Sequence, residues 1–292
     1  MIMSHILKMY YGIDVDINEN GYFQYQGKLY YFAYLKNVQE FLNVYHYYRY
    51  LMHQCHLTGF QLVKNHNQDI ISQNCALFIY QSASFDYPLY LQNILLPMPL
   101  PKIKVIDIKE RWIQKIDCVR EKVREYAYSF KHDQDIISLI YYYCGIAENS
   151  INVLNEILSI DSKATLSLSL ALIHTIDNHV YELLNPCMYC ISTRPRQIVY
   201  LLRSHLLSYE DIQKLLENQY YDVYEMIYLY ARVLYPSHFF DEILCSKLSS
   251  SDVENYYLYL DEERQMYEEM MKIVSFYVRL PKISWINGEN MV

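Results

Sequence analysis

The chain has 292 residues, of which 52% are hydrophobic and 20% are charged, and this balance predicts a folded globular protein and excludes general disorder. The net charge of −8 argues against nucleic acid as the main partner, because phosphate binding requires a basic face. The sequence contains no apolar run of about 18 residues and no secretory signal within Met1–Tyr11. We therefore expect a cytoplasmic protein without a membrane span.

Seven cysteines are scattered along the chain, and they predict reduced thiols in place of a disulfide framework. Cys187 and Cys190 have the spacing of a zinc or redox site, but no second Cys or His pair follows at a matching distance. His53, Cys55 and His56 could ligate a metal from one helix turn, although such histidines are more often core or surface residues. We expect no metal site.

Tyrosine is the most unusual feature of the composition, with 34 residues against six glycines. A tyrosine ring packs in cores and sheets while its hydroxyl stays hydrated, and tyrosine is also a site of oxidative cross-linking. An AT-rich genome, whose codons favour Tyr, Ile, Asn and Lys, explains the same excess without a function. Both interpretations stay open.

The first 80 or so residues combine short runs of Tyr, Val, Ile and Phe with one helix. Turn signals at Asn20-Gly21 and Gln26-Gly27 separate the first runs, and apolar residues at helical spacing predict a helix over Asn37–Leu57. The expected strands are Tyr10–Val15, Tyr22–Gln26, Leu29–Leu35, Phe60–Val63, Ile70–Ser72 and Ala76–Tyr80. This order describes a small α+β lobe.

Residues 81–103 contain four prolines, which disfavour helices and interrupt strand ladders, so we expect a hinge or linker there. The chain after residue 104 is mainly helical in pattern. Ser208 with Asp211, and Ser251 with Glu254, match capping boxes. The expected helices are Ile108–Phe130 and Gln134–Ser159, with others from Ser208, from about Tyr221 and from Ser251 to about Tyr277, whereas Leu166–Ser192 is expected to hold short strands and a loop.

A strand-rich lobe, a hinge and a larger helical lobe follow the order of a protein-kinase-like fold, which includes aminoglycoside and choline kinase relatives. We therefore predict an α+β, two-lobe protein-kinase-like fold. Its N-terminal lobe spans 1–84, its hinge 85–103 and its helical C-terminal lobe 104–292. Fold alone gives no function, so each catalytic part has to be sought separately.

A nucleotide-binding lobe usually has a glycine-rich turn, which lets backbone N–H groups approach the phosphates. The first turn here, residues 18–21, has one glycine, and Glu19 would repel a triphosphate. Lys36 ends the third expected strand and Glu40 opens the next helix, so this pair would bind the nucleotide if one binds. The same i, i+4 spacing also fits an ordinary surface pair.

The catalytic loop of aminoglycoside kinases resembles Ile-His-Gly-Asp followed by Asn, and the nearest segment here is Leu172–Asn178. His174 matches, but Ile176 stands where the catalytic base is needed. Asp177 comes one residue late, which turns its side chain to the other face of an extended chain. Leu183–Tyr200 contains no acid that could hold magnesium. We regard these three positions as degenerate and expect no catalytic residue and no cofactor.

Three strings in the second half of the chain carry a family resemblance. Tyr141–Ile151 (YYYCGIAENSI), Tyr230–Phe240 (YARVLYPSHFF) and Leu280–Ile286 (LPKISWI) resemble, in the same order, strings of the YutH branch of CotS-type spore coat proteins. Where such relatives have a His-Pro-Ser-Arg-Asp-Leu-Ala-type segment, this chain has Arg194–Val199 (RPRQIV), without the aspartate.

The resemblance implies a kinase-like fold and a role in sporulation in a Bacillus-type Firmicute. We therefore expect a catalytically inactive pseudokinase with a structural or interaction role, made in the cytoplasm of the mother cell and deposited on the spore coat, with other coat proteins as partners. An active small-molecule kinase with rearranged motifs, using Lys36, His174 and Asp177, is the alternative. A helical adaptor without kinase ancestry is a third class, and it predicts that no sheet forms near the amino terminus.

Arg232 lies in the second of the resembling strings, next to the apolar positions of its expected helix, and Pro236 ends that helix before His238. One interpretation is a solvated guanidinium on a stem that covers apolar surface. We predict instead a buried guanidinium that bonds a carboxylate or backbone carbonyls, because a buried arginine without partners is very costly.

Overall fold

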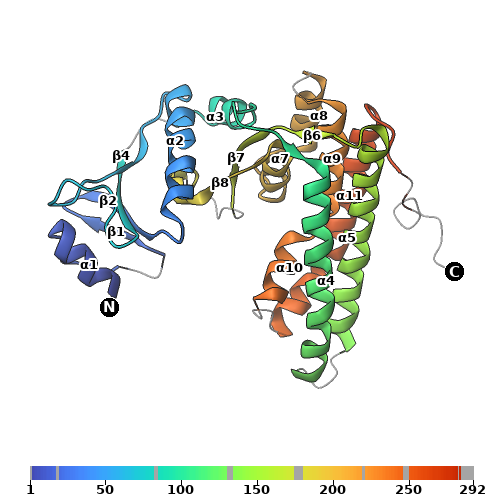
Figure 1. Ribbon diagram of the computed structural model, residues 1–292, viewed down its shortest axis with the longest axis horizontal. Coiled ribbons are helices and arrows are strands. Elements are labelled where there is room, and N and C mark those ends of the chain that lie inside the picture. Colours follow the sequence, from blue (N-terminus) through green and yellow to red (C-terminus); the bar gives the residue numbers. More distant parts are fainter. Residues whose placement is uncertain are drawn as a thin grey trace. The chain divides into compact units, whose positions relative to one another are not determined.

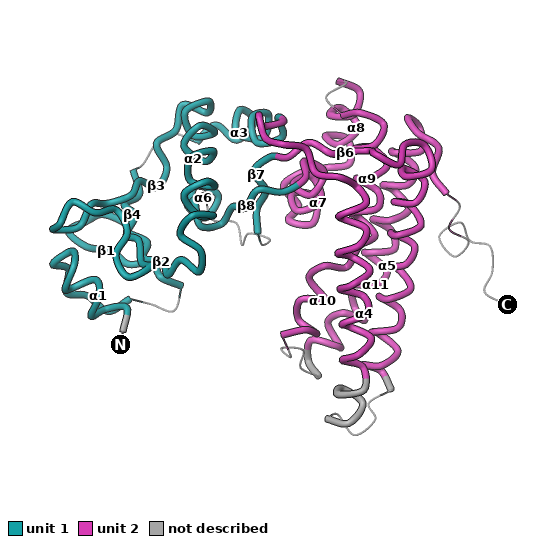
Figure 2. Tube along the Cα trace, viewed as in Figure 1, with its two compact units in different colours: residues 1–96, 169–192 teal, residues 97–168, 193–292 magenta. Residues whose placement is uncertain are grey.

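The computed structural model describes residues 2–17, 20–81, 85–129, 134–173, 180–218, 221–245, 250–281 and 283. The fold is mixed α+β, with a small antiparallel sheet and many helices (Figure 1). The chain divides into two compact units, each made from two stretches of sequence (Figure 2). Unit 1 is Met1–Leu96 with Ser169–Ser192, and unit 2 is Pro97–Leu168 with Thr193–Val292.

Unit 1 is built around a four-stranded antiparallel sheet with strand order β1-β2-β4-β3. Its later stretch adds a two-stranded sheet of β7 and β8. The elements of the first stretch are α1 (Ile2–Tyr11), β1 (Tyr22–Tyr25), β2 (Lys28–Tyr34), α2 (Val38–Gln54), β3 (Gly59–Leu62), β4 (Cys75–Gln81) and α3 (Tyr87–Ile94). Those of the later stretch are β7 (Leu168–Leu172), α6 (Val180–Leu183), the 3-10 turn η1 (Pro186–Met188) and β8 (Tyr189–Thr193).

The hairpin of β1 and β2 closes at the pair Tyr25 and Lys28 around the turn Gln26-Gly27. Both turn residues have positive φ, 49° and 72°, as a two-residue type I′ turn requires. The predicted turn is therefore confirmed. Glycine suits its second position because it adopts this φ without a steric cost.

Helices cover both faces of the sheet, because successive side chains of a strand point to opposite faces. Leu77 and Phe32 pack with Leu7 and other apolar residues of α1. The next residue of β4, Phe78, packs edge-on against Phe41 of α2, with ring centroids 5.8 Å apart. Unit 1 therefore has three layers, helix, sheet and helix.

Two predicted strands of this region are wrong. Tyr10–Val15 does not form a strand, since α1 continues through Tyr11. Met3, Ile6, Leu7 and Tyr10 have helical i, i+3, i+4 spacing, and burial of this face favours the helix. Ile70–Ser72 forms a single bridge from Ser72 to Cys75 in place of a strand. The other predicted strands and the helix are confirmed, with ends shifted by up to a few residues.

Unit 2 is mainly helical. Two of its long helices, α4 (Val105–Ser129) and α5 (Gln134–Ile160), pack side by side, and α9 (Val223–Leu234) packs against α5 (Figure 1). Its elements are β5 (Ile103–Lys104), α4 (Val105–Ser129), α5 (Gln134–Ile160), β6 (Thr165–Leu166), α7 (Arg194–Arg203), α8 (Tyr209–Glu217), α9 (Val223–Leu234), α10 (Ser237–Leu244) and α11 (Ser250–Ser275).

Aromatic side chains fill much of the centre of unit 2. Trp112 of α4 stacks on Tyr235 with ring centroids 4.1 Å apart, and it also stacks on Tyr228 of α9 at 5.7 Å. Tyr143 of α5 lies 4.3 Å from Phe239 of α10. These contacts join helices that are far apart in the sequence.

The helix caps follow the sequence closely. Ser208 and Asp211 form the predicted capping box, and Asp222 caps α9 by accepting a hydrogen bond from the backbone N–H of Glu225. The last helix begins at Ser250, so Ser251 lies inside its first turn and is not the cap.

Some helices were not predicted. The expected linker contains α3, which tolerates Pro88 because proline fits the first turn of a helix. Pro195 has the same role in α7, and α10 begins directly after Pro236. The structure also groups Ser169–Ser192 with unit 1, a return of the chain that the sequence did not predict.

Candidate functional site

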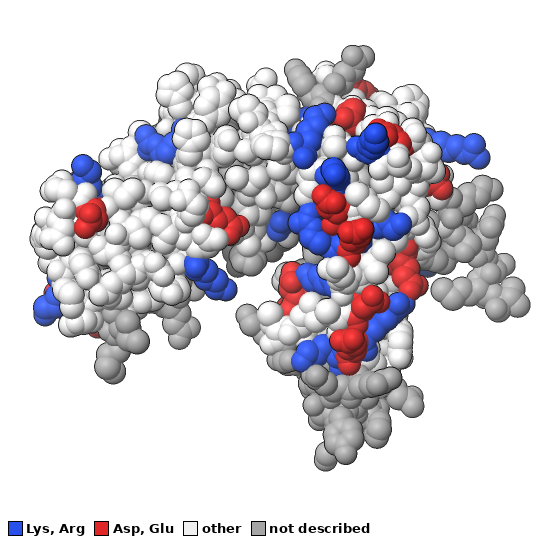
Figure 3. Space-filling model, in the orientation of Figure 1, with Lys and Arg blue, Asp and Glu red and all other residues white. Residues whose placement is uncertain are grey.

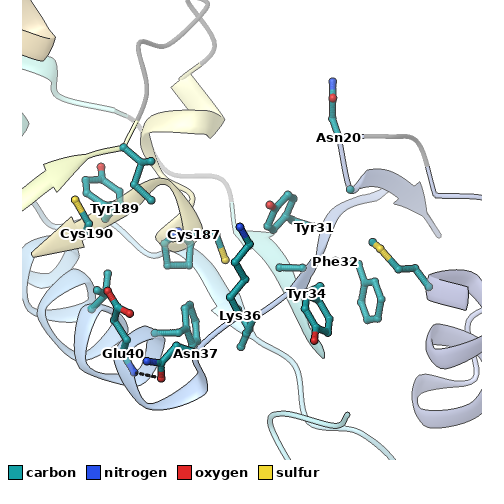
Figure 4. Close-up of a pocket in the computed structure, with 18 residues that line it drawn as sticks. Asn20, Tyr31, Phe32, Tyr34, Lys36, Asn37, Glu40, Cys187, Tyr189 and Cys190 are labelled. Carbon is teal, nitrogen blue, oxygen red and sulfur yellow. Dashed lines mark hydrogen bonds between the residues drawn. The ribbon is translucent and has the colours of Figure 1, made fainter. Parts of the chain in front are cut away.

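Unit 1 contains a pocket with a volume of about 460 Å³. Its walls come from β2, the start of α2 and the later stretch of the unit, from Ile173 to Cys190. Lys36 and Glu40, the two residues predicted to bind a nucleotide, both line it (Figure 4). The structure therefore brings this pair to one site.

Lys36 and Glu40 do not interact directly. The side chain of Lys36 extends toward Tyr31 and Cys187 (Figure 4), and within the described residues it makes no ion pair with Glu40. The reason is local, since Asn37 lies between them as an extended N-cap with φ −136°, and it accepts a hydrogen bond from the backbone N–H of Glu40 at 3.1 Å. Lys36 is thus outside the helix, where the helical i, i+4 rule does not apply.

The wall opposite the lysine consists of tyrosine rings and thiols. Burial raises the pKa of Cys187 to about 12, so this group is a neutral thiol at physiological pH. Burial also raises the pKa of Tyr31. A neutral thiol is a poor metal ligand and a poor nucleophile, so Cys187 serves here as an apolar wall.

Hydrogen bonds of buried tyrosines fix the later stretch of unit 1 against the sheet. The Tyr48 hydroxyl accepts from the backbone N–H of Phe60 at 2.9 Å and donates to the carbonyl of Leu184. Asn185 donates to the Tyr22 hydroxyl at 2.7 Å. The pKa of Tyr22 is raised to about 12, mainly by burial, so it remains a neutral hydroxyl. The pocket is therefore held by a polar network inside an aromatic core.

Gly59 allows the close approach at this network. Its φ is +57°, and a Cβ built there would lie 2.1 Å from the Tyr48 hydroxyl oxygen. No other residue type fits without movement of Tyr48, because the nearest atom belongs to a fully buried ring.

The charged groups of the pocket are few. Among its described lining residues, Glu40 is the one carboxylate and Lys36 the one cation. In magnesium-dependent phosphoryl transfer, one or two carboxylates together with the phosphates hold the metal, and a further acid or a water-positioning residue orients the nucleophile. The segment with His174, Ile176 and Asp177 lies outside the described residues, as does Glu19.

Cys187 and Cys190 both line the pocket, but His53 and His56 are exposed side chains near the end of α2. In the described parts of the chain, no three His, Cys, Asp or Glu side chains gather as a group that could hold a metal ion. Cys55 is buried next to these histidines, and burial raises its pKa to about 11.

Arg232 is buried, as predicted, with 7% of its surface exposed. The predicted carboxylate or carbonyl partner is wrong, because its guanidinium donates to the Ser237 hydroxyl at 2.9 Å and lies 5.9 Å from the ring centres of Trp112 and Tyr235. His238 is mainly exposed, and its Nδ1 lies 3.1 Å from the Tyr256 hydroxyl.

The buried ion pair of unit 2 is formed by Arg194 and Glu225, which sequence reasoning missed. Their N–O distance is 3.0 Å and their side chains are 3% and 2% exposed. Arg194 also lies over the Tyr221 ring at 4.1 Å. Burial raises the pKa of Glu225, and the charge of Arg194 offsets part of that rise. A clue was Arg194 beside Pro195, which marks the first turn of a helix.

Comparisons with family models, with curated proteins and with solved structures gave no match to this chain. In the described residues, every helix is too short or too polar to cross a membrane.

Proposed function

We propose that this chain is a spore-coat-associated, kinase-like protein that transfers no phosphate and has a structural or interaction role in sporulation. The proposal combines the two-lobe order of strands and helices with the resemblance of Tyr141–Ile151 and Tyr230–Phe240 to CotS-type proteins. Its partners are then other spore coat proteins, and its site of synthesis is the cytoplasm of the mother cell.

One observation carries the non-catalytic part of the proposal. The pocket that contains Lys36 and Glu40 has a single carboxylate among its described lining residues, and Lys36 does not pair with it. In active kinases a lysine–glutamate ion pair and metal-binding acids position the triphosphate together. Tyrosine rings and a neutral Cys187 line this pocket instead.

A nucleotide titration tests this part. Thermal unfolding is measured with ATP, with magnesium alone and with both, for the wild type and for Lys36→Ala. Lys28→Ala is a matched control, since Lys28 is an exposed lysine at the start of β2, the strand that ends two residues before Lys36, and it lies outside the pocket. We expect that neither ATP nor magnesium, alone or together, changes the unfolding temperature of any of the three proteins.

A ligand at 100 times its dissociation constant stabilises a protein by about 2.7 kcal/mol. A magnesium-ATP stabilisation of that size that is present in Lys28→Ala and lost in Lys36→Ala would overturn the non-catalytic proposal.

A second experiment tests the role in sporulation. The tagged wild type, Lys36→Ala and Glu40→Gln are produced in a spore-forming host, and the coat fraction of purified spores is probed for the tag. We expect all three chains in that fraction, since an interaction role does not need the nucleotide pair. A wild type confined to the soluble mother-cell fraction contradicts the proposal.

An active small-molecule kinase is the second candidate. The observation in its favour is that Lys36 and Glu40 lie at the same pocket. This candidate predicts magnesium-dependent ATP binding that Asp177→Asn abolishes.

A further inference from the structure

Unit 2 contains a groove with a volume of about 1000 Å³. One wall comes from the end of α7 and the start of α8, and the other comes from α11, which packs against α8 (Figure 1). Ligand pockets commonly have volumes of about 300–1,000 Å³, so this groove has room for several side chains of a partner.

Backbone hydrogen bonds fix the wall formed by α7 and α8. His205, directly after the end of α7, has a positive φ of 55°, and the N–H of Leu206 donates to the carbonyl of Leu201 at 2.8 Å. This arrangement is a Schellman motif, which ends a helix with a sharp change of chain direction. Ser208 and Asp211 then form the capping box of α8. The wall is therefore shaped by its own backbone and caps.

One ion pair joins the two walls of the groove. Arg203 lies 3.9 Å from Glu263, and their side chains are 22% and 19% exposed. Glu263 also accepts hydrogen bonds from the hydroxyls of Tyr143 at 2.8 Å and Tyr267 at 3.2 Å. Arg203 donates to the carbonyl of Val233 at 3.2 Å. The charges of Arg203 and Glu263 therefore offset each other within the folded unit.

Glu210 of α8 and Glu262 of α11 are the other carboxylates of the groove. Both residues are exposed, and neither forms an ion pair with a residue that the structure describes. Two cations are near them in the sequence. Lys214, one turn beyond Glu210, is not a lining residue, and Arg264 pairs with Glu268. Glu210 and Glu262 are thus available to a ligand.

Exposed apolar surface lies beside these carboxylates. Leu258 precedes Glu262 by one helical turn on the same face of α11, and 75% of its surface is exposed. The next residue, Tyr259, lines the groove and is 56% exposed. A contiguous exposed apolar patch marks an interaction site, unlike a single exposed side chain.

The chemistry of the groove selects among ligand classes. With His205 neutral, its three carboxylates and one guanidinium leave an excess of two negative charges, which repels phosphates and nucleic acids. Nowhere in the described chain do acids, histidines or cysteines gather in a group that could hold a metal ion. A second copy of the chain, with its net charge of −8, would bring like charges together. A polyamine would pair with the carboxylates and leave Leu258 in water.

We propose that this groove docks a basic segment of a partner protein. Lysine or arginine side chains of the segment pair with Glu210 and Glu262. An apolar side chain of the segment covers Leu258 beside the ring of Tyr259, whose face also attracts ammonium and guanidinium groups. Docking here rests on the interaction role proposed above and defines the chemistry of the partner. It is measured on the purified chain, so it can fail while the coat-fraction experiment succeeds, and the reverse.

Fluorescence anisotropy with labelled peptides tests the proposal at an ionic strength of about 0.15 M, where distant charges are screened. The first peptide combines lysines with leucines, the second has glutamates in place of the lysines, and the third has serines in place of the leucines. We expect saturable binding of the first peptide and no binding of the second. The third should bind more weakly by roughly tenfold, as for the loss of one buried leucine contact.

Glu262→Lys and Leu258→Ser are the main variants, because both residues are exposed and their replacement leaves the core intact. Glu262→Lys should weaken binding of the lysine–leucine peptide by roughly tenfold, since it removes an attraction and adds a repulsion, each the size of a surface ion pair. Leu258→Ser should weaken it by a similar factor. The matched controls are Glu110→Lys, at an exposed glutamate of α4 outside the groove, and Ile160→Ser, at a residue 60% exposed at the end of α5.

Three results would overturn the proposal. The first is that the wild type shows no saturable binding of the lysine–leucine peptide. The second is that either groove variant binds this peptide as tightly as its control does. The third is that spermidine displaces the labelled peptide as effectively as the unlabelled peptide does, which would assign the groove to a small polyamine.

Discussion

Units 1 and 2 stabilise their interiors with different chemistry. Unit 1 contains few charged residues, and its face in Figure 3 is mostly uncharged, while Lys, Arg, Asp and Glu gather over the helices of unit 2. Among the described residues of unit 1, the buried polar groups are neutral, such as the hydroxyl of Tyr48 and the amides of Asn65 and Asn185. Unit 2 buries charges, namely the Arg194–Glu225 pair and Arg232.

The difference has a physical consequence. A neutral hydroxyl loses a modest hydration energy on burial, and one or two hydrogen bonds offset it. A buried charge loses far more, so its partner becomes indispensable once the charge is in place. Single substitutions should therefore cost more at the ionic sites of unit 2 than at the hydroxyl sites of unit 1.

The largest expected effect comes from Glu225→Leu, which leaves Arg194 buried without its carboxylate. We expect the free energy of unfolding to fall by roughly 3–5 kcal/mol. The double variant Arg194→Met/Glu225→Leu should regain most of that loss, because an apolar pair of similar volume replaces the ion pair. Denaturant unfolding is followed by the fluorescence of Trp112, in a Trp285→Phe background.

The exposed pair Arg264–Glu268 is the control for this cycle. Glu268→Leu should change the free energy of unfolding by less than about 1 kcal/mol, as expected for a surface pair. An equal loss at both pairs would contradict the distinction between buried and exposed charges in unit 2.

Tyr48→Phe should have the next largest effect, and it reports on unit 1. The substitution removes one hydroxyl and leaves the N–H of Phe60 and the carbonyl of Leu184 without it. We expect a loss of about 1–3 kcal/mol, measured as hydrogen exchange of amides in β3 and β4. Tyr50→Phe is the control, since Tyr50 is 56% exposed. If Tyr48→Phe lowered the free energy of unfolding more than Glu225→Leu does, buried hydroxyls in unit 1 would matter more than buried charges in unit 2, contrary to our expectation.

Ser208→Ala should cost about 1 kcal/mol, because it removes the N-cap of α8. Hydrogen bonds from Ser208 also lower the pKa of Asp211 below 3.8. The contribution of Asp211 is therefore present above that pH and is lost as the pH falls through its lowered pKa. A chemical denaturation series from pH 2 to 5 should show a flatter slope in the variant.

The stability contributed by Glu225 should depend on pH in the opposite direction to that of Asp211, and this is the smallest effect that we expect. Its folded-state pKa is raised above 4.5, so the folded protein retains a proton that the unfolded chain has lost. Stability from this group is present below about pH 4.5 and declines as the pH rises through the raised pKa. Glu225→Gln should remove this decline. An unchanged profile between pH 4 and 7 would show that Arg194 keeps the carboxylate ionised throughout.

The sequence predicted most elements whose signal is local. The face of α4 follows from Ile108, Trp112 and Ile116 at helical spacing, and the start of α8 follows from Ser208 and Asp211. The hairpin turn at Gln26-Gly27 needs only its own two residues. These features succeed because their causes lie within a few residues of chain.

Predictions failed where distant residues decide the outcome. Ser169–Ser192 belongs to unit 1, where Tyr48 donates a hydrogen bond to the backbone carbonyl of Leu184 and Tyr22 accepts one from the side chain of Asn185. No local sequence pattern predicts such long-range contacts. Lys36 and Glu40 share a pocket, yet the extended Asn37 between them keeps them from pairing.

Arginine shows the division between the two levels most clearly. The sequence by itself placed Arg232 beside the apolar face of its helix, and this helical periodicity was enough to predict that the side chain is buried. The tertiary structure alone decided that Glu225 pairs with Arg194 and that Arg232 meets Ser237 and two aromatic rings. The physical reason is that burial follows from one helix face, whereas the partner of a buried charge depends on which helices pack against it.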